Sequence, residues 1–140
     1  SFPTRRSSDL ILIRYAEVLL TYAEAQNEAS GPDQSVYDAI NQLRRRPDIN
    51  MPEVPKGLTK DQMREVIRRE RRIELTFEGL YYSDILRWKT AEKENNGMMH
   101  NYDGIEVVKR SFNPKRDYLW PIPYNQTVLN PNLEQNPNWD

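Results

Sequence analysis

The chain has 140 residues, enough for one small domain, and it contains no cysteine. It carries 20 basic and 21 acidic residues, so its net charge is −1. That balance argues against a domain whose main task is to neutralise phosphates, and the lack of cysteine excludes disulfides and thiolate metal sites within these residues. The sequence also lacks the apolar run of about 18 residues that a membrane-spanning helix needs.

The first ten residues need separate treatment. Residues 1–10, SFPTRRSSDL, resemble the translation of a common sequencing-adapter oligonucleotide over their whole length. We interpret them as an artefact and leave them out of the fold prediction, the alternative being a native polar lead-in. On this interpretation the protein itself begins upstream of Ile11, and the lack of a signal peptide carries no information.

The sequence from Leu12 onward predicts a helical hairpin. Apolar and small side chains recur there at intervals of three and four residues, and Gly31-Pro32 ends this first helix. Asp33 can cap a second helix, and the short connection makes the two helices antiparallel neighbours. Their pattern of Tyr, Ala and Leu is typical of tetratricopeptide-like hairpins. The expected apolar stripes comprise Leu12, Tyr15, Ala16, Leu19, Tyr22, Ala23, Val36, Ala39, Ile40 and Leu43.

A third and a fourth helix are expected in the middle of the chain. Thr59 and Gln62 form a capping box for the third helix, which should continue to about Glu78. Gly79 interrupts it, and the fourth helix is expected over residues 81–93. The expected inner residues of the two helices are Met63, Val66, Ile67, Ile73, Phe77, Ile85, Leu86 and Trp88.

The C-terminal part has a different character. After Asn96-Gly97, Asn and Pro become frequent, and only Ile105–Val108 has the composition of a short strand. The prolines of residues 119–123 block helix formation and favour extended backbone. The predicted fold class is therefore all-α: about four helices in tetratricopeptide-like hairpins, followed by an extended Pro/Asn-rich C-terminal segment.

Three carboxylates stack along one face of the third helix, at Glu70, Glu74 and Glu78. Glycosidases use paired carboxylates, but these flank a cleft and usually come from different elements. A metal site in a helical bundle needs a Glu-x-x-His motif, and the single histidine, His100, lies in a predicted loop. We therefore predict partly buried arginine–carboxylate networks that tie helices together, with no catalytic residue, metal site or cofactor. Candidate partners are Arg71, Arg72 and Arg87.

Arginines and aromatic residues each permit a second interpretation. The arginines at 44–46 and 64–72 could form a nucleic-acid surface, but interleaved glutamates favour pairing along the helix, so no nucleic-acid partner is expected.

Exposed aromatic rings could stack on sugars. Helical position places Trp88 in the core, and the flanking prolines favour Trp120 as an anchor of the tail. Ligand-binding residues stay unassigned.

Three stretches in this order resemble the C-terminal region of the SusD/RagB family. They are RYAEVLL with YAEA and AINQLR at residues 14–44, IRRERRIEL with FEG and YSDILRWK at residues 67–89, and LWPIP with NPNLEQNP at residues 119–137. One departure is Arg46-Pro47-Asp48, where relatives more often show an Arg-Ala-Gly-like helix end. A proline there still ends the helix, so the fold prediction is unchanged.

The resemblance implies that residues 11–140 are the C-terminal part of a helical lipoprotein on the outer face of the bacterial outer membrane. Such proteins bind oligosaccharides, and sometimes peptides, for a SusC-like TonB-dependent transporter, without chemical catalysis. They are held by a lipidated cysteine that would lie upstream of this chain. The resemblance also implies scaffold roles: Glu70, Glu74, Arg87 and Trp88 hold helices, while Trp120 and the prolines fasten the tail.

Two other functions stay open at this point. A stand-alone tetratricopeptide-like adaptor would bind proteins through a helical groove, and it would need a polar outer face on its first helix. Leu12, Tyr15 and Leu19 argue against such a face. A glycoside hydrolase would use Glu70 or Glu74, and would lose its activity in the glutamine variants.

Overall fold

The computed structural model describes residues 12–139, which form two compact units. The described part of unit 1 runs from Leu12 to Glu78 and contains three helices, and unit 2 follows from Gly79. The segment 1–10 and its interpretation as an artefact lie outside the described residues. Among residues 12–139, no helix is both long and apolar enough to cross a membrane.

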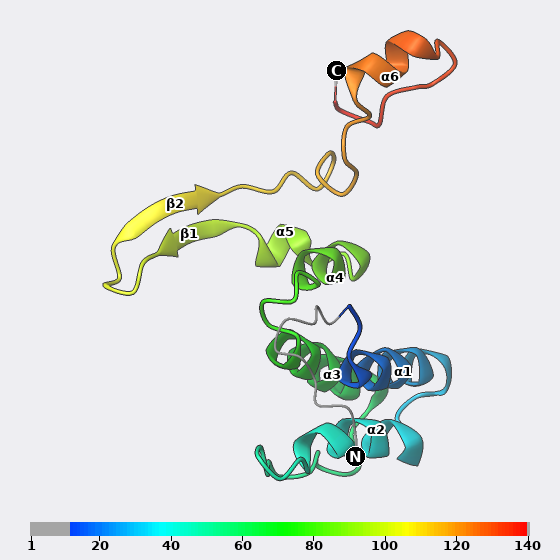
Figure 1. Cartoon of the computed structure of the whole chain (residues 1–140), viewed down its shortest axis with the longest axis vertical. Helices are drawn as coiled ribbons and strands as arrows, with labels where there is room; N and C mark the ends of the chain where they lie inside the picture. Colours follow the sequence, from blue (N-terminus) through cyan, green and yellow to red (C-terminus); the bar gives the residue numbers. More distant parts are fainter. Residues whose placement is uncertain (1–11, 140) are drawn as a thin grey trace, which may run out of the picture. The chain divides into compact units, whose positions relative to one another are not determined.

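Unit 1 is built around the predicted helical hairpin (Figure 1). Helix α1 spans Tyr15–Ser30 and helix α2 spans Gln34–Arg44, and α1 packs against both α2 and the third helix, α3, at Lys60–Glu74. Gly31, with φ of 87°, ends α1, and the carboxylate of Asp33 caps α2 by accepting two backbone N–H bonds, as predicted. The largest buried side chains of this core are Leu20, Val36, Ile40, Met63 and Ile67.

Two buried asparagines fasten the loop and the helix that follow this hairpin. Asn41 accepts a hydrogen bond from the Val54 backbone N–H at 2.9 Å, and Asn27 donates one to the Lys60 carbonyl at 3.1 Å. Both side chains are at most 3% exposed. Because a buried amide without a partner costs about 1–3 kcal/mol, these bonds fix the position of the connection to α3.

The predicted capping box at the start of α3 is confirmed. The Thr59 hydroxyl accepts a bond from the Gln62 N–H at 3.3 Å, and the Gln62 side chain accepts one from the Thr59 N–H at 2.9 Å. Thr59→Ala should therefore lower the free energy of unfolding by about 1 kcal/mol, since a free N–H is left at the helix end. Urea denaturation checks this, with Thr59→Ser as the control that keeps the cap; equal losses in both variants would contradict it.

Helix α3 ends earlier than predicted, at Glu74 instead of Glu78. Phe77 has a left-handed backbone (φ of 67°) and a fully exposed side chain, and Ile73 is 61% exposed. The expected inner positions of Ile73 and Phe77 are therefore wrong, whereas Met63 and Ile67 are confirmed. Instead, Arg71 is buried and donates a hydrogen bond to the Thr21 hydroxyl of α1.

Unit 2 contains three helices and one hairpin where a single helix and a short strand were predicted. The helix predicted over residues 81–93 is divided into α4, Tyr81–Arg87, and α5, Ala91–Glu94. Lys89 lies between them with φ of 57°, which breaks the helical path. Residues 12–139 thus hold six helices, more than the four expected, within a fold that is mainly helical as predicted. Ile85, Ala91 and Phe112 form the buried core of the unit, with Tyr81, Leu86 and Tyr118 packed against it.

Strands β1, Gly97–His100, and β2, Glu106–Arg110, form an antiparallel hairpin in unit 2. Gly97 pairs with Arg110, and a register shift follows Met99. Every residue of both strands is exposed. The first strand escaped prediction because a strand without a buried face leaves no alternation of apolar and polar residues.

Side-chain hydrogen bonds to the backbone hold the tail of unit 2. The Gln135 amide donates to the Ile122 carbonyl at 2.9 Å and accepts from the Ile122 N–H at 2.7 Å. Asn136 donates to the Trp120 carbonyl at 2.6 Å. A short helix, α6 at Tyr124–Leu129, lies within the C-terminal segment that was predicted to be extended.

Candidate functional site

The three carboxylates that were predicted to stack on the third helix all have arginine partners from elsewhere in unit 1, but Glu78 lies beyond the end of α3. Glu70 accepts hydrogen bonds from Arg44 at 3.1 and 2.6 Å. Glu74 accepts bonds from Arg14 at 2.9 Å and from Arg46 at 3.0 and 2.6 Å. These donors come from the start of α1 and from the end of α2 and the residues just after it.

Glu78 completes this network by accepting a bond from Arg14 Nε at 2.9 Å. Arg14 therefore joins two carboxylates four residues apart, and its Nη2 also donates to the Glu74 carbonyl at 2.8 Å. The pKa of the Arg14 guanidinium is raised, first by the hydrogen bonds to Glu78 and then by those to Glu74. These side chains tie α1, α2 and α3 together, which confirms the predicted kind of network, although the partners Arg14, Arg44 and Arg46 were not among the candidates Arg71, Arg72 and Arg87.

The electrostatics of Glu74 fit a structural role. Partial burial has the largest single effect on the pKa of Glu74, and it raises that pKa. The hydrogen bonds and charges of Arg46 and Arg14 together outweigh burial, so the pKa of Glu74 is lowered. A general acid needs a raised pKa, and a nucleophile needs free space beside it. Glu74 has neither property. Its pKa is lowered, and its oxygens already accept hydrogen bonds from two guanidinium groups.

The lowered pKa of Glu74 predicts a loss of stability in acid. Its ordinary pKa is 4.5 and its folded pKa is lower, so its contribution is complete above about pH 5 and is lost as the pH falls through the folded pKa. The free energy of unfolding, measured by urea denaturation between pH 7 and pH 3, should fall less steeply in Glu74→Gln than in the wild type. Parallel curves for the two proteins would contradict this linkage.

The arginines at 44–46 and 64–72 also pair with carboxylates. Arg45 pairs with Glu53 at 2.5 Å, and Arg64 pairs with Glu28 at 2.5 Å and also with Asp61. Carboxylates thus interrupt what would otherwise be a continuous basic stripe. Within residues 12–139, no group of three or more His, Cys, Asp or Glu side chains could hold a metal ion, and His100 lies exposed in β1.

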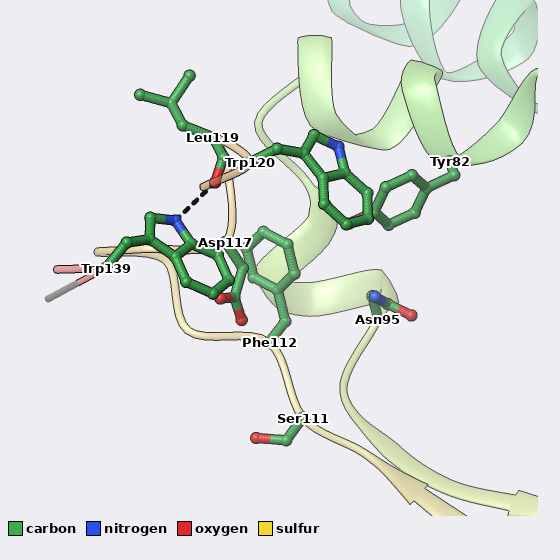
Figure 2. Close-up of a pocket in the computed structure, with 8 residues that line it drawn as sticks. All are labelled: Tyr82, Asn95, Ser111, Phe112, Asp117, Leu119, Trp120 and Trp139. Atoms are coloured by element: carbon green, nitrogen blue, oxygen red, sulfur yellow. Dashed lines mark hydrogen bonds between the residues drawn. The ribbon is translucent and has the colours of Figure 1, made fainter. Parts of the chain in front are cut away.

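Unit 2 holds a pocket of a different kind, lined largely by aromatic rings (Figure 2). Its volume is about 120 Å³. The rings of Tyr82 and Trp120 meet edge to face, with centroids 6.3 Å apart and planes at 62°. Its lining residues are Tyr82, Asn95, Ser111, Phe112, Asp117, Leu119, Trp120 and Trp139.

The walls of this pocket are held by specific bonds. The Trp139 indole N–H donates to the Leu119 carbonyl at 2.9 Å, as Figure 2 shows, and the Arg116 guanidinium lies 4.5 Å from the Trp139 ring centre. Phe112 packs edge to face on Tyr118, with centroids 4.8 Å apart. The Trp139 indole and the Phe112 ring thus each have a partner within unit 2.

Asp117 supplies the pocket with an ionised acceptor. It accepts bonds from Arg116 Nε at 2.6 Å and from the Asn113 N–H at 2.7 Å. These two bonds lower the pKa of Asp117, with the Arg116 bond the larger influence. A fixed carboxylate and the Asn95 amide thus lie beside broad aromatic surfaces, a combination that suits a ligand with one apolar face and a polar rim.

The structure corrects the expected role of one tryptophan. Trp120 is 71% exposed, so it does not anchor the tail by burial; the hydrogen bond from the Asn136 side-chain amide to the Trp120 carbonyl holds the tail instead. Trp88 is half-buried, with the Arg87 guanidinium 4.9 Å from its ring centre, and Arg87 also pairs with Asp84 at 2.9 Å. Sequence reasoning missed the pocket because its walls come from segments up to 57 residues apart, Tyr82 to Trp139.

Comparison with known proteins gives a consistent result. The model of the SusD family matches residues 3–139. SusD-like protein P2 of Formosa agariphila is 36% identical over 135 residues, which cover 93% of this chain and 26% of that relative. SusD-like protein P38 of the same organism is 29% identical over 140 residues, which cover 96% of this chain and 25% of that relative.

Solved structures give the same match. A SusD-like carbohydrate-binding protein of Bacteroides fragilis has 37% identity and a TM-score of 0.78, over 88% of this chain and 28% of its own. A SusD homologue of Bacteroides thetaiotaomicron has 35% identity and a TM-score of 0.72, over 91% of this chain and 26% of its own. The chain therefore spans about a quarter of the length of these relatives. With a family model that matches nearly its whole length, this chain belongs to the SusD family.

Proposed function

We propose that this chain is part of a protein that binds oligosaccharide nutrients at the bacterial outer membrane and delivers them to a SusC-like TonB-dependent transporter. The observation that carries the proposal is family membership together with a relative, 37% identical, that is described as carbohydrate-binding. Peptides are the alternative nutrient. The longer protein would be a surface-exposed lipoprotein, with its lipidated cysteine upstream of this chain.

The aromatic pocket of unit 2 is the proposed site of sugar contact. A pyranose ring has an apolar C–H face that stacks on aromatic rings and a rim of hydroxyl groups that need hydrogen-bond partners. Trp120 and Tyr82 offer the ring surfaces, and Asp117 and Asn95 offer the polar partners. A volume of about 120 Å³ with an open, exposed Trp120 suits one sugar residue of a longer chain better than an enclosed small ligand.

Binding without hydrolysis fits the chemistry of this pocket. Asp117 is the one carboxylate among the eight residues that line it, and it already accepts two hydrogen bonds. Glycoside hydrolysis ordinarily needs two carboxylates about 5–10 Å apart on either side of the bond. We therefore assign this protein a role in capture and delivery, with no catalytic residue and no cofactor.

The domain assignment is part of the same proposal. Residues 11–140 form the C-terminal part of a longer helical protein, and residues 1–10 are an adapter artefact. The coverage of about a quarter of each relative supports a longer protein. Long-read sequencing of the source locus across the junction at Leu10 and Ile11 tests both, because the artefact would be replaced there by a continuous upstream reading frame.

The binding function is tested directly with the purified chain. An array of neutral and acidic oligosaccharides, with a peptide library as the comparison, should show retention of oligosaccharides. Isothermal titration with the best-retained oligosaccharide should give a dissociation constant in the micromolar to millimolar range, as expected for a shallow site. Retention of peptides alone would mean that the ligand is a peptide and not an oligosaccharide. Release of reducing ends from the oligosaccharides would contradict a pure binding role.

A further inference from the structure

Asp117 gives the aromatic pocket of unit 2 a negative charge (Figure 2). Of the eight residues that line the pocket, it is the one that is charged at neutral pH, since the other seven have aromatic, aliphatic, amide or hydroxyl side chains. The Asp117 side chain is 16% exposed, so water screens its charge only in part. A ligand in the pocket therefore meets a fixed negative charge.

The positive partner of Asp117 lies outside this lining. Arg116 donates from Nε to the Asp117 carboxylate at 2.6 Å, while its guanidinium lies 4.5 Å from the ring centre of Trp139. The Arg116 side chain is 41% exposed, so water screens its charge more than that of Asp117. Arg116 thus fixes the carboxylate without lining the pocket, and it weakens the negative charge there without cancelling it.

The carboxylate of Asp117 can accept further hydrogen bonds. Its Oδ1 accepts the bond from Arg116, and its Oδ2 accepts the bond from the Asn113 N–H. A carboxylate has about four acceptor positions, so each oxygen can accept one more bond. A sugar hydroxyl can donate such a bond, whereas the carboxylate of a uronic acid and a sulfate ester are ionised at neutral pH and can only accept. The hydrogen-bond chemistry of the pocket therefore matches an uncharged sugar and opposes an anionic one.

We propose that Asp117 makes this pocket select uncharged sugar residues over uronic-acid and sulfated ones. The inference rests on the proposed sugar-binding function and adds the class of oligosaccharide to it. A volume of about 120 Å³ equals a sphere about 6 Å across, so an anionic group on a sugar seated there lies within about 6 Å of the carboxylate.

The size of the preference follows from this distance. At about 6 Å, the repulsion between two unit charges weakens binding about threefold in water and about a hundredfold at the effective dielectric constant near a protein surface. Arg116 offsets part of the negative charge, which brings the expected preference for the uncharged sugar to about tenfold.

Matched pairs of oligosaccharides test the proposal with the 140-residue chain. Hexasaccharides of glucose, mannose and galactose are each compared with the derivative whose C6 hydroxyl groups are oxidised to carboxylates, so the members of a pair share a backbone and differ in charge. Isothermal titration at pH 7 and about 20 mM NaCl should show the neutral member bound about tenfold more tightly. At about 500 mM NaCl the screening length falls from about 20 Å to about 4 Å, so the ratio should fall to about threefold.

Asp117→Asn separates the charge of the pocket from the charge of the whole chain. It removes the negative charge and keeps one oxygen as an acceptor, so the ratio should fall to about twofold or less. Asp103→Asn is the matched control and should keep the ratio at about tenfold. Asp103 is exposed in the loop between β1 and β2 and does not line the pocket, and its exchange changes the net charge of −1 by the same amount. Thermal denaturation checks that both variants are folded, and the salt dependence of the wild type needs no variant.

Three results would overturn the proposal. Equal or tighter binding of the oxidised members by the wild-type chain would show that the pocket does not exclude anionic sugars, while neutral binding would leave the proposed function intact. A preference that stays the same both in folded Asp117→Asn and at high salt would assign the selectivity to another group. Binding of neither member of any pair would remove the sugar-binding function itself, and this inference with it.

Discussion

Glu74→Ala is expected to lower the free energy of unfolding by about 2–4 kcal/mol, the largest effect of any exchange in the ion network. Glu74 is the point where α1, α2 and α3 meet, since it accepts hydrogen bonds from both Arg14 and Arg46. Its side chain is 14% exposed, so water replaces the lost carboxylate poorly. Two partly buried guanidinium groups would lose a shared partner, which costs more than the exchange of a single surface pair.

Urea denaturation at pH 7 measures this effect, and Glu65→Ala is its matched control. Glu65 lies on the same helix, is 77% exposed, and pairs with Arg68 at 3.8 Å. An exposed pair contributes between 0 and 1 kcal/mol, so the control should lose less than about 1 kcal/mol. Similar losses in both variants would contradict the assignment of Glu74 as the central residue of the network.

Trp120→Ala is expected to weaken oligosaccharide binding by about tenfold or more, because it removes the most exposed ring of the proposed platform. The fold should tolerate the change. The Trp120 ring meets Tyr82 edge to face, and the hydrogen bond from the Asn136 side-chain amide to the Trp120 carbonyl does not need the Trp120 side chain. The loss of binding should thus come without a matching loss of stability.

Isothermal titration with the best-retained oligosaccharide, combined with thermal denaturation, checks this prediction. Tyr102→Ala is the control, since Tyr102 is 98% exposed in the loop of the β1–β2 hairpin and is not part of the pocket. Tyr82→Ala should lie between the two, because Tyr82 is only 37% exposed. If Trp120→Ala and Tyr102→Ala bound equally well, the pocket would not be the site.

Local signals made the helical part of this fold predictable from sequence. Asp33 and the pair of Thr59 and Gln62 each satisfy backbone groups within three residues, so their effect is visible in the sequence itself. The end of α3 and the break at Lys89 were missed because both depend on left-handed residues, Phe77 and Lys89, that are neither glycine nor asparagine.

The candidate site was harder to predict because its contacts join distant residues. Arg14 reaches Glu74 across 60 positions, and Arg46 reaches it across 28. The pattern of Glu70, Glu74 and Glu78 indicated a network, but no spacing rule names partners so far away. The exposure of Trp120 was likewise hidden, since its flanking prolines predict an extended backbone and say nothing about what lies against the ring.

The central claim, that the chain binds sugar at the pocket of unit 2, is tested most directly by fluorine NMR. The chain has three tryptophans, so 5-fluorotryptophan gives three signals that Trp→Phe variants can assign. On titration with the best-retained oligosaccharide, the signals of Trp120 and Trp139 should shift together, while that of Trp88, which does not line the pocket, stays in place. Saturating oligosaccharide that leaves the Trp120 signal unmoved would contradict the account.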